Sequence, residues 1–304
     1  QTATLPQAFP KGFRAFYLMK SEISQRQYVD FLNTLTRLQQ NTRTESNVTT
    51  DAITNTYVMS NTASMSYRNG IRCPASGNGT TNPITFGCDY DGDGVFNESN
   101  DGGWIACNLL SWADGAAYGD WAGLRPFTEL EFEKAARGGQ SPVLNEYAWG
   151  NSATIQEATG ISGAATKSEG PSNGAANCVY NNNGSVQGPL RSGAMARAGT
   201  TRVQAGAGYS GALDLSGNLW ERPVTVGNAT GRLFDGRHGD GKLNASGDAN
   251  ETNWPGTAAT GSGFRGGNWY NVATRARVSD RYNAAYTVSF RNVYYGGRCA
   301  RTSP

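Results

Sequence analysis

The stretch from Cys107 to Asn151 places the strongest constraint on how this chain folds. An apolar run leads into a predicted helix over 112–121, and a Gly-Leu-Arg-Pro turn separates it from a second predicted helix over 128–137. Thr128 and Glu131 have the spacing of a capping box, in which a hydroxyl and a carboxylate each satisfy a free backbone N–H. An apolar stripe follows, and a Gly-Gly pair ends the helix.

The segment from Phe13 to Leu38 predicts a strand followed by an amphipathic helix. Ser24 is the expected N-cap, because its hydroxyl can accept from the first turn. The apolar face has helical spacing. It consists of Tyr28, Phe31, Leu32 and Leu35.

These segments resemble the formylglycine-generating, sulfatase-modifying-factor domain family. The matching residues occur in the family's order: Glu22-Ile23-Ser24, the 107–151 stretch, Leu213 to Glu221, Phe264 to Trp269, and Gly297-Arg298-Cys299. The resemblance implies an α+β fold, a formylglycine-generating-enzyme-like variant of the C-type lectin fold. Such a fold is rich in loops and has short antiparallel strands and few helices.

Composition agrees with a loop-rich chain. Only 16% of the 304 residues are charged and 40 are glycine, which favours short strands and polar loops over a helix bundle. We therefore expect one domain over 1–304. Polar segments without family motifs predict insertions at about 39–106, 152–210 and 227–262.

Charge and cysteine content bound the partners and the compartment. A net charge of +2 gives no basis for binding nucleic acid, and no apolar stretch is long enough to span a membrane. Five cysteines in a Gly/Asn/Thr-rich chain, together with the N-terminal Gln, favour a secreted, extracellular or cell-surface protein. Proximity suggests a Cys73–Cys88 disulfide, with Cys107–Cys178 as a weaker pairing and one cysteine left over.

The sharpest chemical motif is the acidic stretch from Asp89 to Asp101. Carboxylates at alternate positions followed by Gly allow a tight loop to wrap oxygen ligands round Ca²⁺. The stretch resembles the calcium loops of dockerin and thrombospondin-type repeats, except that Asn100 stands where an acid is usual. The alternative is a solvated acidic turn. The expected calcium ligands are Asp89, Asp91, Asp93, Val95 through its carbonyl, Asn97, Asn100 and Asp101.

Two more segments are weaker calcium candidates. Residues 235–241 with Asp248 are acidic but irregularly spaced, and Asx-turns explain them equally well. The resemblance implies a further possibility at Asn218 and Glu221. We expect Glu221 instead to lie in the core and to pair with an arginine.

Redox catalysis is not supported by the residue types present. The resemblance implies two copper-binding cysteines shortly after the Gly-Gly turn, but residues 268–277 contain none. Iron sites of the ergothioneine-type relatives need several histidines, and His238 is the only one in this chain. We expect no catalytic residues. A metal-dependent oxidoreductase with an altered active site stays open as an alternative.

The C-terminal segment predicts a recognition surface, because aromatic rings alternate there with Asn and Arg. The expected ligand-binding residues are Trp269, Tyr270, Asn271, Arg275, Tyr282, Asn283, Tyr294 and Tyr295. Several of these aromatic residues are equally well explained as core. The expected function is a non-catalytic, calcium-stabilised extracellular module that binds a protein or glycan. A self-assembling structural subunit and a diversified, retroelement-type variable protein also stay open as functions.

Overall fold

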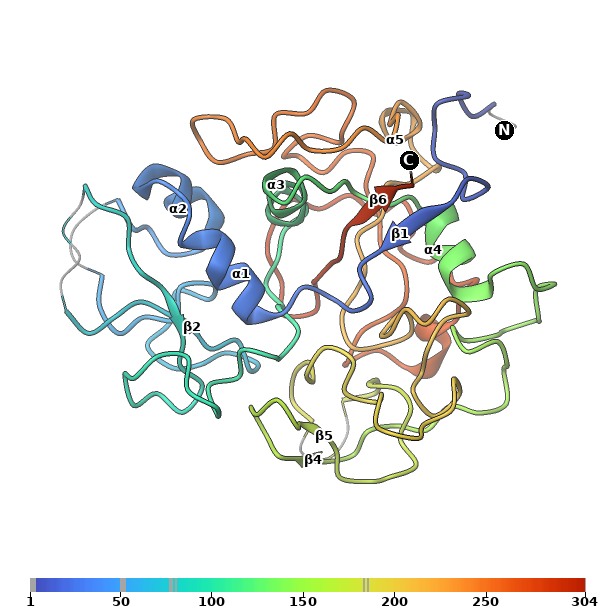
Figure 1. Cartoon of the computed structure of the whole chain (residues 1–304), viewed down its shortest axis with the longest axis horizontal. Coiled ribbons are helices and arrows are strands. Elements are labelled where there is room, and N and C mark those ends of the chain that lie inside the picture. Colours follow the sequence, from blue (N-terminus) through green and yellow to red (C-terminus); the bar gives the residue numbers. More distant parts are fainter. Residues whose placement is uncertain are drawn as a thin grey trace.

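The computed structural model describes residues 4–49, 53–76, 79, 81–182, 184 and 186–303 (Figure 1). Short helices and very short antiparallel strands are joined by long loops. The helices are α1 (Gln25–Leu32), α2 (Arg37–Arg43), α3 (Trp112–Trp121), α4 (Glu129–Arg137) and α5 (Ala229–Arg232), with a 3-10 turn at Ala273–Ala276. The strands are β1 (Phe16–Leu18), β2 (Ile71–Arg72), β3 (Gly87–Cys88), β4 (Ile161–Ser162), β5 (Gly170–Pro171) and β6 (Ala300–Thr302). The expected mixture of few helices and short antiparallel strands is confirmed.

One strand from near each end of the chain lies at the centre of the fold. β1 pairs antiparallel with β6, with Phe16 opposite Thr302. In Figure 1 this pair lies between α3 and α4, and the three polar segments predicted as insertions extend to different edges of the molecule. No helix within the described ranges is both long and apolar enough to cross a membrane.

Capping residues set the beginnings of the predicted helices. α3 covers the predicted 112–121, and α4 begins after Thr128 with the expected capping box to Glu131. Ser24 caps α1 as predicted, with Gln27 as its capping-box partner. The expectation of one continuous helix towards Leu38 is wrong, because Thr36 caps a separate helix, α2.

Arginine–carboxylate pairs tie the C-terminal segment to the rest of the fold. Arg265 donates to Glu129 and Glu133 of α4, each at 3.0 Å. Arg298 pairs with Glu221 at 2.5 Å, and both side chains are completely buried. The expected pairing of Glu221 with an arginine is confirmed. Such buried pairs fix how the chain packs, since removing one partner leaves the other charge buried and unpaired.

The predicted disulfides do not form. All five cysteines, each in the described part of the chain, are free and buried. Cys88 lies opposite Ile71 in the β2–β3 pair, so Cys73 is only a diagonal neighbour. Diagonal neighbours are about 7–8 Å apart, with the Cβ atoms somewhat closer, whereas a disulfide needs Cβ atoms about 4 Å apart. Cys178 donates instead to the Ser216 carbonyl at 3.2 Å, so Cys107–Cys178 is also wrong.

Candidate functional site

The acidic loop begins directly after β3. Asp89 is completely buried and accepts hydrogen bonds from the backbone N–H groups of Gly92 and Gly94, at 2.8 and 3.2 Å. Both glycines have positive φ angles, 80° and 89°, which side chains disfavour. The Asp-Gly-Asp-Gly pattern therefore closes the loop locally. Arg72 from β2 forms an ion pair with Asp89.

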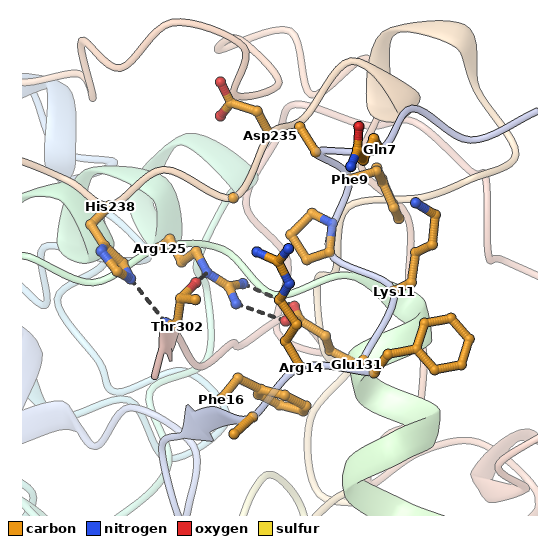
Figure 2. Close-up of a pocket in the computed structure, with 16 residues that line it drawn as sticks. Gln7, Phe9, Lys11, Arg14, Phe16, Arg125, Glu131, Asp235, His238 and Thr302 are labelled. Carbon is orange, nitrogen blue, oxygen red and sulfur yellow. Dashed lines mark hydrogen bonds and ion pairs between the residues drawn. The ribbon is translucent and has the colours of Figure 1, made fainter. Parts of the chain in front are cut away.

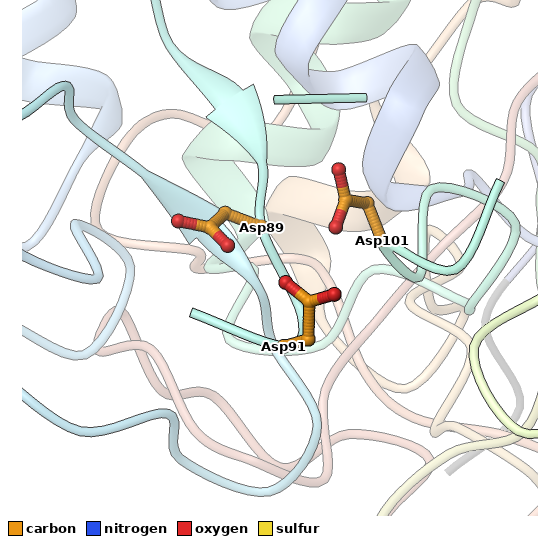
Figure 3. Close-up of side chains that lie close together, drawn as sticks. All are labelled: Asp89, Asp91 and Asp101. Carbon is orange, nitrogen blue, oxygen red and sulfur yellow. The ribbon is translucent and has the colours of Figure 1, made fainter. Parts of the chain in front are cut away.

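Three carboxylates converge in this loop (Figure 3). One oxygen each from Asp89, Asp91 and Asp101 lies within 4.8 Å of the others. Asp101 is fully buried; its Oδ2 accepts from the Glu98 N–H at 2.6 Å, whereas its Oδ1 has no hydrogen-bond partner among the described residues. Burial first, and then the charges of Asp91 and Asp89, raise the pKa of Asp101 to about 6. Hard oxygen donors gathered in this way suit Ca²⁺.

The remaining predicted ligands are distributed around this group. Asp93 belongs to a second, exposed acidic group with Asp91 and Glu98. The Asn100 amide donates to Asp91 at 2.6 Å, whereas the Asn97 side-chain oxygen accepts from the Cys88 N–H at 3.1 Å. The Val95 side chain is exposed, and its N–H donates to Asp93 at 2.8 Å. The carboxylates of Asp89, Asp91 and Asp101 therefore form the best-placed set of oxygens.

A third acidic group brings together residues that lie far apart in the sequence. Asp120 at the end of α3, Asp240 and Glu251 offer oxygens within 4.8 Å of one another. Asp120 is buried, and its two oxygens accept from the backbone N–H groups of Asp240 and Asn250, each at 3.0 Å. Asp120 was not expected here, because no sequence spacing links it to the 235–241 loop.

The rest of that weaker calcium candidate is used in ion pairs. Asp235 pairs with Arg237 at 2.9 Å, and Asp248 pairs with Arg43 at 2.6 Å. The two aspartates are thus already neutralised by arginines. Of the aspartates in the predicted segment, only Asp240 belongs to the acidic group.

Four aromatic residues form a partly exposed cluster, which we call the aromatic platform: Tyr67, Trp269, Tyr270 and Tyr294. Trp269 is buried at its base, and the other three ring centroids lie 5.3–5.8 Å from it. Tyr67 and Tyr270 are about half exposed. Tyr67 comes from the 39–106 segment, so it could not be predicted from the pattern of aromatic residues in the C-terminal segment.

The remaining predicted ligand-binding residues divide between surface and core. Tyr282 is exposed, and the Arg275 guanidinium stacks on its ring at 3.5 Å. Tyr295 is buried against Phe264, with ring centroids 4.6 Å apart. Asn283 is half-buried and its carbonyl accepts from the Phe264 N–H.

Asn271 is the predicted ligand-binding amide nearest in sequence to Tyr270 of the aromatic platform. It is half-buried, and its backbone N–H donates to the Asn268 side chain at 2.9 Å. Its own side-chain oxygen is buried and has no partner among the described residues. This oxygen is therefore an unsatisfied acceptor inside the protein, and it does not belong to the exposed surface of the aromatic platform.

A pocket of about 480 Å³ lies between residues 7–16 and the end of β6 (Figure 2). On one wall Arg125 donates to Glu131 at 2.7 Å, and its Nε donates to Thr302 at 2.9 Å. The His238 Nε2 accepts from the Thr302 N–H at 2.9 Å, and burial together with nearby arginines lowers the pKa of His238. His238 is thus a neutral, hydrogen-bonding residue here, and the polar groups of this wall satisfy one another.

The cysteines do not fit the copper site that the family resemblance implies. Cys299 packs against α3, where its Sγ is 3.9 Å from the Gly115 carbonyl, whereas Cys178 lies in another core cluster. Burial raises the pKa of Cys88 and of Cys299 to about 12. Copper needs two adjacent thiolates, and these thiols are buried and protonated.

Comparison with known proteins places this arrangement in a family. Residues 7–303 match the sulfatase-modifying factor enzyme 1-like domain, so the chain belongs to that family. A formylglycine-generating enzyme from Thermomonospora curvata is 51% identical over 45 residues, which are 15% of this chain and 14% of that protein. The matched region thus spans far less than two thirds of that relative.

Two solved structures are also similar. PvdO from Pseudomonas aeruginosa superposes with a TM-score of 0.44 at 16% identity, covering 95% of this chain and 80% of PvdO. The Treponema denticola variable protein 1 superposes with a TM-score of 0.36 at 17% identity, covering 66% of this chain and 72% of that protein.

Proposed function

We propose that this chain is a secreted, non-catalytic member of its family, with a C-type-lectin-type fold, that acts as a calcium-stabilised extracellular binding module. The observation that carries the proposal is the aromatic platform. Tyr67 and Tyr270 expose about half of their surface while they pack on the buried Trp269. Rings held in this way offer apolar area to a partner at a low entropic cost.

The hydroxyl groups of the platform tyrosines add direction to this surface. Tyr67, Tyr270 and Tyr294 each carry a hydroxyl group that can donate and accept a hydrogen bond. Tyrosine rings with such hydroxyl groups suit either the hydroxyl groups of a glycan or the backbone of an extracellular protein.

Calcium at the acidic loop would stabilise the 39–106 segment, which also supplies Tyr67. Asp89, Asp91 and Asp101 are the residues that would hold the ion, and its charge would satisfy the orphaned Asp101 oxygen. The proposed extracellular location would suit this role, because extracellular modules bind calcium at about 10⁻⁴–10⁻³ M. The free cysteines lend the secreted location no support.

Binding of labelled protein to a glycan array and to intact cells of the organism that encodes the chain tests this function. We expect signal on one of the two, reduced about tenfold in Tyr270→Ala, which corresponds to about 1.4 kcal/mol. Tyr17→Ala is the matched control, because Tyr17 is exposed on β1 and outside the platform.

Protease treatment of the cells separates the two partner classes. Lost binding indicates a protein, and retained binding with an array signal indicates a glycan. Absence of binding to both surfaces, or equal binding by wild type and Tyr270→Ala, would overturn the proposal.

A further inference from the structure

Arg222 is a buried arginine without an ion pair of its own: the Asp114 carboxylate acts on it at a distance and is itself paired with Arg43 and Arg291. The Arg222 side chain is 5% exposed, and it takes part in none of the ion pairs formed by the described residues. Its Nη2 donates to the Val288 carbonyl at 2.8 Å and to the Ser262 hydroxyl at 3.4 Å. Its Nε and Nη1 are buried and have no hydrogen-bond partner among the described residues. Two donors are therefore left without a partner, and the positive charge is met by a carboxylate only at a distance.

Aromatic rings compensate only part of this charge. The guanidinium carbon lies 4.4 Å from the centroid of the Phe264 ring and 5.5 Å from that of Tyr295. Such contacts offset only part of the cost of burying an ion. Burial lowers the pKa of Arg222 to about 9, so the side chain still carries its charge at pH 7.

Arg222 also lines a small cavity between the first turn of α3 and the segment that leads into β6. The cavity measures about 20 Å³, and its lining residues also include Ser111, Gly115, Gly297 and Cys299. A Cβ atom built on Gly115 or on Gly297 would meet nothing within 4 Å, so both glycines leave space at the wall. A cavity of this size holds one particle about as large as a water molecule. Sulfate and phosphate ions are much larger than a water molecule.

We propose that a small monovalent anion of the size of chloride binds in this cavity and neutralises Arg222. A water molecule would satisfy one or two N–H groups but would leave the charge unpaired, whereas a halide ion does both. The anion would hold the guanidinium against Phe264 and Tyr295 and join the C-terminal segment to α3. This site is independent of the aromatic platform and of the calcium loop.

Thermal melts at constant ionic strength test the site, with sodium chloride replaced stepwise by sodium gluconate, whose anion is too large to enter. In the wild type we expect a rise in melting temperature that saturates with chloride. Gly297→Ala places a methyl group at the cavity wall and should abolish the rise, because Gly297 has no left-handed φ that would strain alanine. Gly139→Ala is the matched control, because Gly139 also faces open space but lies after α4.

Two further measurements identify the occupant. Arg222→Met should melt at the same temperature in chloride and in gluconate; if it does not fold, Gly297→Ala carries the test. Crystals soaked in sodium bromide should show an anomalous peak within hydrogen-bonding distance of the Arg222 guanidinium. Equal melting of the wild type in both salts, or an ordered water molecule there without bromide, would overturn the proposal.

Discussion

The carboxylates of α4 and those of the acidic loop differ in how their negative charges are neutralised. Glu129 and Glu133 on α4 are met by Arg265, which donates to both. In the loop, Arg72 meets Asp89, but Asp91 and Asp101 have no arginine partner among the described residues. The first group is neutralised within the protein. The second is the group at which we propose that a cation from outside the chain binds, and this difference separates a structural ion-pair cluster from a candidate metal site.

The largest expected effect comes from breaking the α4 group. Arg265→Ala leaves the buried Glu129 with only a longer contact to Arg281, at 3.7 Å, so the free energy of unfolding should fall by about 3 kcal/mol in urea titrations. Arg26→Ala is the control, because the Arg26–Asp30 pair is exposed and worth about 0.5 kcal/mol or less. Similar losses in the two variants would remove the contrast between the regions.

Calcium removal should act on the loop alone. With free calcium at about one hundred times its dissociation constant, binding stabilises the folded state by about 2.7 kcal/mol, which EGTA should abolish. Asp91→Asn should melt at the same temperature with and without EGTA. An EGTA shift that persists in Asp91→Asn would place the ion elsewhere, with the Asp120 group as the next candidate.

The pH dependence of the metal-free protein sharpens the comparison further. The pKa of Asp101 is raised to about 6 in the folded state, above the usual value of about 3.9, so the folded state binds this proton more tightly than the unfolded state. The contribution of Asp101 to stability should therefore fall as pH rises from about 4 to about 6 and stay constant above. Unfolding of wild type and Asp101→Asn across this range measures the difference, which saturating calcium should remove. A wild-type contribution that rises with pH would contradict the assignment.

The smallest effect on stability is expected at the platform. Tyr270 is half exposed, so Tyr270→Ala should change the free energy of unfolding by no more than about 0.5 kcal/mol, even though binding weakens. A large stability loss measured by urea titration would make Tyr270 a structural residue instead.

The sequence predicted those features that depend on residues close together in the chain. Thr128 with Glu131, and Ser24 with its helix, are capping interactions between residues three apart, so the sequence contains both partners. Likewise, the alternation of Asp and Gly after β3 closes a local loop, which brings Asp89 and Asp91 close together.

Contacts that depend on strand register or on the packing of distant segments could not be predicted in the same way. Cys73 and Cys88 are close in sequence, yet the β2–β3 register keeps them diagonal. Tyr67 reaches Trp269 and Asp120 reaches Asp240 only because distant loops pack together. The sequence did not single out Arg222, because only the folded structure shows that this buried arginine has no ion-pair partner among the described residues.

Calorimetric titration of calcium into metal-free protein at pH 7, for wild type and Asp101→Asn, tests the central claim most directly. The loop carboxylates predict saturable binding in the wild type and the loss of a binding event in Asp101→Asn. No saturable heat in the wild type, or the same titration in both proteins, would contradict a calcium site in this loop.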